Sequence, residues 1–301
     1  MTLLKSLARA TGALALAITG GCTTANAEPE VAASAPVADG PALWKLSDED
    51  TTIYLFGTIH ALPGDVDWYD GRIAAAFDAS DELVTEIAMD DQQALAQSLV
   101  SSAMLESGQN LRDLMTEENR AEYEQTMIDL GLPPGALDPL EPWFAALNLS
   151  MLPLMQSGID PAAGVDMVLT QAGAAKNKAA LETIEEQLAL FDTMPVADQL
   201  TFLDATVEGV PEAATMLRRL IDLWMVGDAD GLAAAMNEGM EDPALYKRLL
   251  IDRNTNWTGW IENRLAEPGT VFIAVGAGHL AGTGSVQEQL AARGIEVERV
   301  N

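Results

Sequence analysis

Residues 51–60 have the sequence TTIYLFGTIH, an apolar run that ends at one of only two histidines in the 301-residue chain. The other histidine ends a second such run, TVFIAVGAGH, at residues 270–279. Apolar segments rich in β-branched and aromatic residues are typical of strands buried on both faces of a sheet. Each histidine also follows a glycine by three residues, which gives a Gly-x-x-His motif twice. The two runs predict that both ends of the chain contribute strands to one sheet.

Shorter segments on either side extend the expected sheet. ALWKLSD at residues 42–48 is expected to pair with the run at 51–59, and ELVTEIA at 82–88 is expected to be the next strand. After the second histidine, GTGSVQEQLAARG at 282–294 predicts a loop and a helix, and IEVERV at 295–300 predicts a last strand. The end of the chain therefore predicts a β-α-β unit.

The chain between about residues 90 and 260 has a mainly helical pattern. Apolar residues recur at spacings of three and four in the stretches at 90–106, 111–131 and 214–240. KAALE, residues 178–182, interrupts this pattern and is compatible with either a buried strand or a helix. We therefore expect an α/β (α+β) fold over residues 42–301. Its mixed sheet is built from N- and C-terminal strands, with a large helical insertion at about 90–260.

The first 27 residues have the pattern of an export signal. Two basic residues precede the apolar segment ATGALALAITGG, and Ala25–Ala27 forms a cleavage site of small residues. A second interpretation ends the signal at residue 21 and makes Cys22 the lipid-bearing first residue of a lipoprotein. Both place the protein in the periplasm or cell envelope, with membrane contact only through the signal or a lipid on Cys22. Residues 28–41, rich in Ala and Pro, are expected to form a flexible spacer.

The chain is strongly acidic, with 46 Asp and Glu residues against 16 Lys and Arg and a formal net charge of −30. Such a charge repels nucleic acid and anionic membrane surfaces, so neither is an expected partner. It favours cationic or neutral substrates. The single cysteine means that the chain forms no internal disulfide.

Four side chains capable of metal binding or proton transfer fall where strands are expected to end. His60 and His279 follow the two apolar runs, Glu86 lies at the end of the strand at 82–88, and Glu182 ends KAALE. Open α/β sheets bind ligands at the carboxyl ends of their strands. These four residues are therefore expected to face one crevice.

Glycines and a polar pair supply candidate supporting residues. The glycines of the two motif regions are Gly57, Gly276 and Gly278. A glycine permits a positive φ or a close backbone approach where a strand breaks into a loop. Arg253, followed by Asn254, is a candidate to anchor a substrate carboxylate or to stabilise an oxyanion. Trp143, at an expected helix start, is interpreted as a core or cleft-lining residue.

Two imidazoles and a carboxylate are common ligands of a catalytic divalent metal that keeps an open position for water. The expected set is His60, His279 and Glu86, and the metal would activate water and polarise a carbonyl. An alternative needs no metal, because one histidine acts as general base while Glu86 or Glu182 orients it or serves as the acid. A third alternative is a cleft that binds a small peptide or saccharide without turnover.

The segments around both motifs resemble those of the TraB/GumN (also PrgY) family, which is related to the Tiki proteases. The resemblance is carried by TIYLFGTIHALP at 52–63 and VFIAVGAGHLAGTGSVQEQLAARGIEVERV at 271–300. Interior segments extend it: EPWFAALNL, GVDMVLTQAGAAKNKAALETIEEQLALFDTMP and LIDRNTNWTGWIEN. The Leu-Glu-Thr element of the family matches Leu181–Thr183, and its Arg-Asn pair matches Arg253 and Asn254.

This resemblance implies an α/β fold similar to those of erythromycin-esterase-like and ChaN-like proteins. Tiki members are metal-dependent proteases, so it implies a metal site at His60, His279 and Glu86, with Arg253 in support. The implied metal is Mn²⁺ or Co²⁺, and the implied substrate is a peptide or another small carbonyl compound. Bacterial members are linked to pheromone shutdown and to exopolysaccharide gene clusters.

Overall fold

The computed structural model describes residues 40–69, 71–88, 98–99, 101–238 and 243–300. The expected export signal, Cys22 and most of the expected spacer lie outside these residues, as does most of the first half of the helix expected at 90–106. The elements with the bounds that the structure gives them are β1 (Leu43–Ser47), β2 (Thr51–Thr58), β3 (Leu62–Pro63), α2 (Gly71–Ala79), β4 (Glu82–Thr85), η2 (Leu111–Leu114), α4 (Glu117–Asp129), α5 (Pro142–Gln156), β5 (Ile159–Asp160), η3 (Pro161–Ala163), α6 (Val165–Ala172), β6 (Asn177–Ala180), α7 (Ile184–Asp192), α8 (Val196–Gly209), η4 (Val210–Glu212), α9 (Ala213–Met225), α10 (Ala229–Asn237), α11 (Pro243–Tyr246), the π-helical η5 (Lys247–Ile251), α12 (Asp252–Leu265), β7 (Gly269–Gly276), η6 (Ala277–Leu280), α13 (Val286–Ala292) and β8 (Glu298–Arg299).

A mixed sheet with the strand order β6-β4-β7-β2-β1-β8 forms the centre of the protein. β2 and β7 pair in parallel along their whole length, from Thr51 opposite Gly269 to Thr58 opposite Gly276. β4 and β6 continue the parallel arrangement on one side, and β1 runs antiparallel to β2 on the other. The expected α/β (α+β) class and the strand pair at the N-terminus are confirmed. KAALE begins in a strand, β6, but this edge strand is exposed or half-buried and not buried as the strand interpretation expected.

The last strand lies farther from β7 than a simple β-α-β unit would place it. β8 pairs antiparallel with β1, so it runs in the same direction as β2 and β7. β2 and β1 lie between β7 and β8 in the sheet. The predicted order of strand, helix and strand is correct, and the connection through α13 crosses over two strands.

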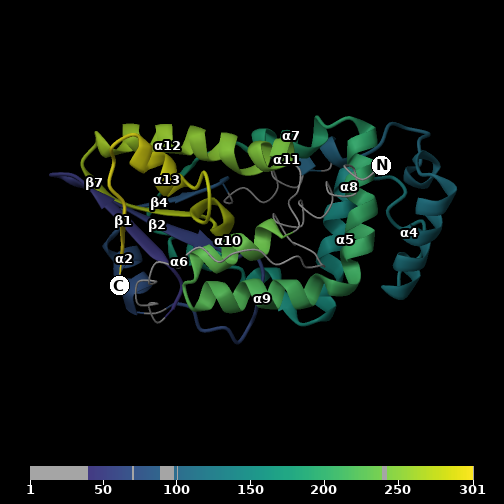
Figure 1. The fold of residues 1–301 in the computed structure, drawn as a ribbon, viewed down its shortest axis with the longest axis horizontal. Coiled ribbons are helices and arrows are strands. Elements are labelled where there is room, and N and C mark those ends of the chain that lie inside the picture. The colour runs from purple at the N-terminus through teal and green to yellow at the C-terminus, as the bar shows by residue number, and fades with distance from the viewer. Residues whose placement is uncertain (1–39, 70, 89–97, 100, 239–242, 301) are drawn as a thin grey trace, which may run out of the picture.

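Helices cover both faces of the sheet, as Figure 1 shows. Phe272 and Ala274 of β7 pack into a core with α2, α6, α9 and α10. Val271, Ile273 and Val275 of the same strand pack into a core with α12 and α13. Because successive residues of a strand point to opposite faces, a strand covered on both faces needs a continuous apolar sequence. This explains the two apolar runs that end at the histidines.

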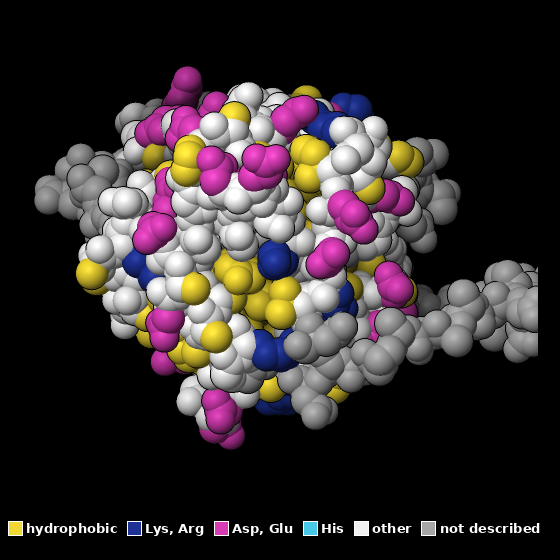
Figure 2. All heavy atoms as spheres, turned by 90° about the vertical axis from the view of Figure 1, so that its left-hand side faces the viewer, with side chains coloured by type: hydrophobic (Ala, Val, Ile, Leu, Met, Phe, Trp, Pro, Cys, Tyr) yellow, Lys and Arg dark blue, Asp and Glu magenta, His cyan; other side chains and the backbone are white. Residues whose placement is uncertain are grey.

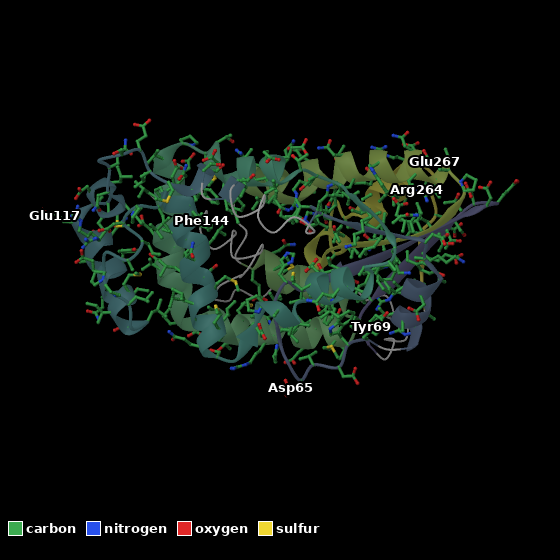
Figure 3. All side chains as sticks on the ribbon, turned by 180° about the vertical axis from the view of Figure 1, so that it is seen from behind. Asp65, Tyr69, Glu117, Phe144, Arg264 and Glu267 are labelled. Carbon is green, nitrogen blue, oxygen red and sulfur yellow. The ribbon has the colours of Figure 1, made fainter. Side chains whose placement is uncertain are left out.

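A separate core, formed by helices alone, lies at the end of the molecule away from the sheet, where Figure 1 shows α4, α5 and α8. Trp143 is fully buried there and stacks on Phe191, with ring centroids 5.9 Å apart. Trp143 is therefore a core residue of this helical end and does not line the candidate site described below. Figure 3 shows the length of the molecule between the two ends, with Glu117 on α4 at one end and Arg264 and Glu267 at the other.

The outer surface agrees with the charge of the chain. Figure 2 shows Asp and Glu side chains distributed over the face at the sheet end of the molecule, with fewer Lys and Arg side chains among them. Within the part of the chain that the structure describes, no helix is both long and apolar enough to cross a membrane.

The three motif glycines serve close packing. A Cβ atom at Gly57 would lie 3.0 Å from the Cα of Ala277, because η6 passes directly over the end of β2. At Gly278 the nearest atom would be Cε of Met236, at 2.5 Å. Gly57, Gly276 and Gly278 are all absent from the glycines with positive φ. The expectation of a positive φ is wrong, because Gly57 and Gly276 end extended strands and Gly278 lies in the 3-10 helix η6, whereas the expectation of a close approach is correct.

We predict that Gly57→Ala destabilises the protein by about 1–3 kcal/mol, because the added methyl group overpacks the contact with Ala277. Gly64→Ala is the matched control, since a Cβ there meets nothing within 4 Å. It should change stability by less than about 0.5 kcal/mol. Urea unfolding of both variants measures the difference, and equal stabilities would contradict the packing argument.

Candidate functional site

Four parallel strands end at the same edge of the sheet. The register places Thr58 opposite Gly276, and it places Thr85 opposite both Ala274 and Ala180. The side chains that follow these strand ends are His60, Glu86, Glu182 and His279. The four residues lie at one edge of the sheet as expected, but the expectation that all four face one crevice is wrong for Glu182, which is turned to Arg253 and Trp257.

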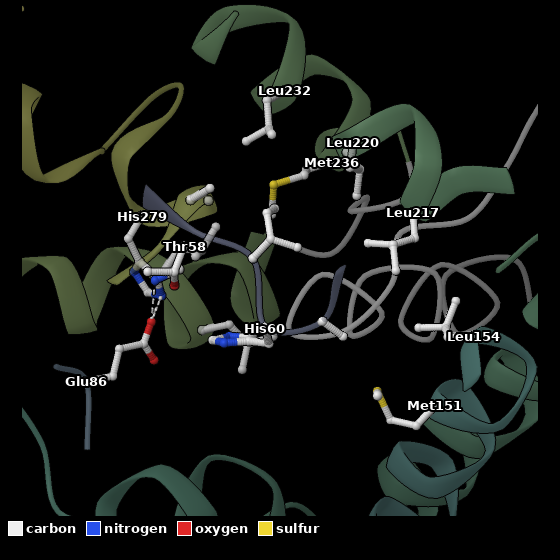
Figure 4. A pocket seen from close by; sticks show the side chains of 17 residues that line it. Thr58, His60, Glu86, Met151, Leu154, Leu217, Leu220, Leu232, Met236 and His279 are labelled. Atoms are coloured by element: carbon white, nitrogen blue, oxygen red, sulfur yellow. Dashed lines mark hydrogen bonds and ion pairs between the residues drawn. The ribbon is translucent and has the colours of Figure 1, made fainter. Parts of the chain in front are cut away.

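A pocket of about 130 Å³ lies at this edge. His60, Glu86 and His279 line it, and Figure 4 shows their side chains. Glu182 and Arg253 do not line it; they lie behind Glu86 and His279.

Gly276 is the point on which three functional side chains converge. A Cβ atom there would lie 3.2 Å from Oε1 of Glu86, 3.6 Å from Cδ2 of His279 and 3.8 Å from Nε2 of His60. The backbone N–H of Gly276 also donates a hydrogen bond to Oε1 of Glu86, at 2.7 Å. A glycine at this position therefore leaves room for two imidazoles and a carboxylate around one small volume.

His60 is held from the side of α6. Its Nδ1 lies 2.8 Å from Oδ2 of Asp166, and the N–H of Val165 donates to the carbonyl of Ile59 at 2.9 Å. A Cβ atom at Gly164 would lie 2.1 Å from the carbonyl oxygen of His60, so only glycine allows this approach. The carboxylate of Asp166 raises the pKa of His60 to about 9, although burial acts in the opposite direction. Because 47% of the His60 side chain is exposed, solvent screens this pair.

His279 is buried and uncharged. Its Nδ1 lies 2.6 Å from Oδ1 of Asn254, whose Nδ2 donates to the carbonyl of Gly284 at 2.9 Å. The second bond fixes the amide orientation, so Nδ1 of His279 carries the proton and Nε2 carries the lone pair. Nε2 accepts a hydrogen bond from Nη1 of Arg253 at 3.0 Å. Burial, together with the nearby charge of Arg253, lowers the pKa of His279 to about 3.

Arg253 directs its donors into the protein. Nε donates to Glu182 at 2.8 Å, and Nη2 donates to Glu86 at 2.6 Å and to Glu182 at 2.9 Å. Nη1 donates to His279 and to the carbonyl of Leu249. A guanidinium has five N–H donors, and these contacts use all of them. The expectation that Arg253 anchors a substrate carboxylate therefore does not fit, because no donor is left for the substrate.

The two glutamates on Arg253 have different environments. Burial favours the neutral acid of Glu86, but the charges of Arg253 and the histidines outweigh it and hold the pKa of Glu86 below its ordinary range. Burial raises the pKa of Glu182, and Arg253 offsets only part of this effect. Trp257 donates from Nε1 to Glu182 at 3.0 Å, and its ring lies 4.7 Å from the guanidinium carbon of Arg253. We infer that Glu182 positions Arg253, while Glu86 is the carboxylate that faces the pocket.

The donor set at Gly276 was compared with the needs of a metal ion. Within the described ranges, no group of three or more His, Cys, Asp or Glu side chains is arranged to hold an ion in its present positions. The donor chemistry nevertheless fits one divalent ion. His60 and His279 each hold Nδ1 on a side-chain oxygen. Nε2 of His60 lies near Gly276 and Oε1 of Glu86, and Nε2 of His279 lies 3.9 Å from that oxygen with Arg253 as its present partner. A hydrogen bond at the second ring nitrogen is the usual arrangement of a metal-binding histidine.

Sequence reasoning missed several residues of this site: Thr58, Asp166, Gln187 and Trp257. Gln187 donates to Oε2 of Glu86 at 3.0 Å. Trp257 lies one helical turn after Arg253, so the period of the predicted helix could have identified it. Thr58 ends β2 and lines the pocket, yet its hydroxyl is buried with no hydrogen-bond partner.

Comparison with known proteins agrees with the motifs. The model of the TraB/PrgY/gumN family matches residues 42–299. The chain belongs to this family. YbaP of Escherichia coli K12, an uncharacterized protein, is 24% identical over 239 residues, which cover 79% of this chain and 87% of YbaP. An uncharacterized protein of Treponema pallidum is 22% identical over 259 residues, which cover 81% of this chain and 78% of that protein. No solved structure matches the chain.

We predict that Arg253→Met destabilises the protein by about 3–5 kcal/mol at neutral pH, because it leaves two buried carboxylates without a cation. Without the guanidinium, burial raises the pKa of both carboxylates in the folded state. The variant therefore recovers stability as the pH falls from about 7 to about 5 and the carboxylates take up protons. Urea unfolding at both pH values measures the effect.

Arg264→Met is the matched control on the same helix, since Arg264 pairs with Glu82 alone at 2.9 Å and is less buried. It should lose no more than about 1 kcal/mol. A loss for Arg253→Met no larger than that of the control would refute the central role of Arg253.

We predict that Thr58→Val leaves stability unchanged or raises it by about 1 kcal/mol, because valine keeps the shape and removes an unpaired buried hydroxyl. Thr85→Val is the matched control at the end of β4, where the hydroxyl donates to the carbonyl of Ile87 at 2.8 Å. This variant should lose about 1 kcal/mol. Thermal unfolding compares the two, and a clear loss for Thr58→Val would mean that its hydroxyl has a partner in the protein.

Proposed function

We propose that the protein is a metal-dependent hydrolase of peptide-like substrates. One observation carries the proposal: two histidines hold Nδ1 on side-chain oxygens, of Asp166 and Asn254, and Nε2 of His60 and the ring of His279 lie with Oε1 of Glu86 around Gly276. Nε2 of His279 lies 3.9 Å from that oxygen and accepts from Arg253, so an ion would take the place of this hydrogen bond. Two imidazoles and one carboxylate leave positions of a divalent ion open for water and substrate. Membership of the TraB/PrgY/gumN family is compatible with this proposal and does not by itself assign a reaction.

Each residue of the site has a role in the proposed reaction. His60, His279 and Glu86 would hold a divalent ion such as Mn²⁺ or Co²⁺. When bound, such an ion lowers the pKa of water and polarises a carbonyl group. Asp166 and Asn254 keep the imidazoles in the orientation that presents Nε2 to the pocket. Arg253 holds Glu86 and His279, and Glu182 holds Arg253.

Arg253 also explains how His279 could change partners. In the structure, Nη1 of Arg253 donates both to Nε2 of His279 and to the carbonyl of Leu249. If His279 gives its lone pair to an ion, one N–H of Nη1 keeps the carbonyl of Leu249 as its acceptor and the other loses His279. Binding of the ion must offset the cost of this unpaired donor, about 1–3 kcal/mol, unless a bound ligand accepts from it.

Glu86 is the residue that we assign to proton transfer. Its pKa lies below the ordinary range, so it is a carboxylate at neutral pH. Oε1 faces the pocket, while Oε2 is held by Arg253 and Gln187. In steps where it is not bound to the ion, Oε1 is placed to accept a proton from water that attacks a carbonyl carbon, and to return that proton to the leaving amine or alcohol.

The proposed location is the periplasm or cell envelope, and it rests on the signal-like pattern of residues 1–27. An acidic exported protein suits peptide or neutral carbonyl substrates rather than nucleic acid. Cleavage after Ala27 and a lipid on Cys22 remain the two alternatives for its N-terminus.

A metal-free reaction is the alternative that a specific contact favours. The pair of His60 and Asp166, 2.8 Å apart, resembles the base and orienting carboxylate of many hydrolases. The pKa of about 9 makes His60 an imidazolium at neutral pH, so it would act first as a proton donor. This metal-free reaction would continue after a chelator removes metal ions. A third alternative, a protein that only binds its ligand, would show affinity without turnover.

We predict that the exported protein binds one Mn²⁺ or Co²⁺ and cleaves peptides, and that His60→Ala and His279→Ala abolish both properties. Asp166→Asn keeps His60 and weakens its orientation, so it should lower metal affinity about 10–100-fold. Asp160→Asn is the matched control, because Asp160 only caps η3 through the N–H of Ala162. Metal titration and hydrolysis of a mixed peptide pool, with and without chelator, provide the measurements.

Hydrolysis that persists after chelation but disappears in His60→Ala would establish the metal-free reaction instead. Peptide binding without hydrolysis under all conditions would establish a binding protein. Metal affinity that is unchanged in both histidine variants would exclude the proposed ligand set.

A further inference from the structure

The pocket has an apolar wall beside the polar centre. The wall consists of side chains from α5, α9 and α10: Met151, Leu154, Leu217, Leu220, Leu232 and Met236. In Figure 4, His279 and Glu86 lie at one end of the view, Met151, Leu154 and Leu217 lie at the other, and His60 lies between them. A ligand that reaches the polar centre therefore has an apolar surface next to it.

The wall is in direct contact with the loop that carries His279. A Cβ atom at Gly278 would lie 2.5 Å from Cε and 3.3 Å from Sδ of Met236. Met236 thus packs against the residue before His279, and the apolar wall begins one residue from the proposed ligand. Substrate atoms that touch this wall are close to the bond that would react.

The size of the pocket fits one large side chain. Its volume is about 130 Å³. An apolar cavity of roughly 150 Å³ accepts a benzene ring, so the pocket has room for a side chain such as that of leucine or phenylalanine. Burial of such a side chain contributes about 1.5–3 kcal/mol, which is enough to select it over a small residue.

The apolar wall disfavours a charged side chain. No Lys or Arg is among the described residues that line it, and Arg253 behind it has no donor left for a ligand. An anionic side chain or a terminal carboxylate would therefore find no cation in the lining apart from the histidines. A cationic side chain would lose its hydration against leucine and methionine without a carboxylate among the six wall residues.

We infer that the apolar wall is a specificity subsite for one large, uncharged, apolar side chain of a peptide, adjacent to the bond that is cleaved. The inference rests on the proposed function for the position of the cleaved bond, and on the wall itself for the choice of side chain. It favours a position within the peptide chain for this side chain, because the six wall residues offer no cation to a terminal carboxylate.

The test uses the metal-loaded protein and internally quenched peptides that differ at one central residue: Ala, Leu, Phe, Lys or Glu. We expect kcat/KM to be at least about 10-fold higher for Leu and Phe than for Ala, and lowest for Glu. Met151→Ala enlarges the pocket and should shift the preference towards Phe at the expense of Leu. Met155→Ala, one turn farther along α5 and 55% exposed, is the matched control and should keep the wild-type preference.

Binding of N-acetyl-leucine amide and N-acetyl-alanine amide, followed by NMR titration, separates failure of the subsite from failure of the hydrolase. Cleavage without preference for Leu or Phe would overturn the subsite and leave the hydrolase standing. Tighter binding of the leucine amide, lost in Met151→Ala, without cleavage of any peptide would overturn the hydrolase and support the subsite. Equal binding of the two amides, with no cleavage, would overturn both.

Discussion

The guanidinium of Arg253 joins the elements that form the functional edge of the sheet. It extends from α12 to Glu86 after β4, to Glu182 after β6 and to His279 after β7. Two buried carboxylates share this one cation, so the network holds an excess of negative charge. Buried charge of this kind is costly unless it is compensated. A proton on His60 or on Glu182 compensates this charge, and a cation bound in the pocket would do the same.

This requirement gives the pocket its polarity. Glu86 turns Oε2 towards Arg253 and Oε1 towards Gly276, where its remaining acceptor capacity is exposed to the cavity. The neutral Nε2 of His279 lies 3.9 Å from the same oxygen. Hydrogen-bond acceptors are thus concentrated on one wall of the pocket, and the charge of Glu86 favours a cation over an anion there. The apolar side chains of α5, α9 and α10 on the other side exclude water and strengthen that preference.

The sequence was sufficient to predict the main strands of the sheet and the residues that lie at its edge. Continuous apolar runs predicted strands covered on both faces, and the residues after those runs were the ones that converged. It was insufficient for contacts made across the helical region. Asp166 lies 106 residues from His60 in sequence, and no periodicity relates the two. The wall residues have helical spacing that predicts an apolar face, but spacing does not say whether that face meets a core or a pocket. For the same reason the sequence left open whether Trp143 is a core residue or lines the cleft, since an apolar residue at a helix start is compatible with both.

The two histidines of the repeated motif differ in protonation, and this difference comes from the residues around them. His60 and His279 have the same local sequence pattern, and each holds Nδ1 on a side-chain oxygen. The partner of His60 is the carboxylate of Asp166, whose charge raises the pKa of His60 to about 9. The partner of His279 is an amide, and Arg253 faces its other nitrogen in a buried position, so its pKa falls to about 3. One imidazole is therefore prepared to donate a proton and the other to donate a lone pair. A bound cation would remove this difference, because it would replace the proton on Nε2 of His60 and the hydrogen bond on Nε2 of His279. The two histidines would therefore play the same role only if both bound one ligand. To do so, His60 would have to lose a proton and His279 would have to lose its hydrogen bond to Arg253.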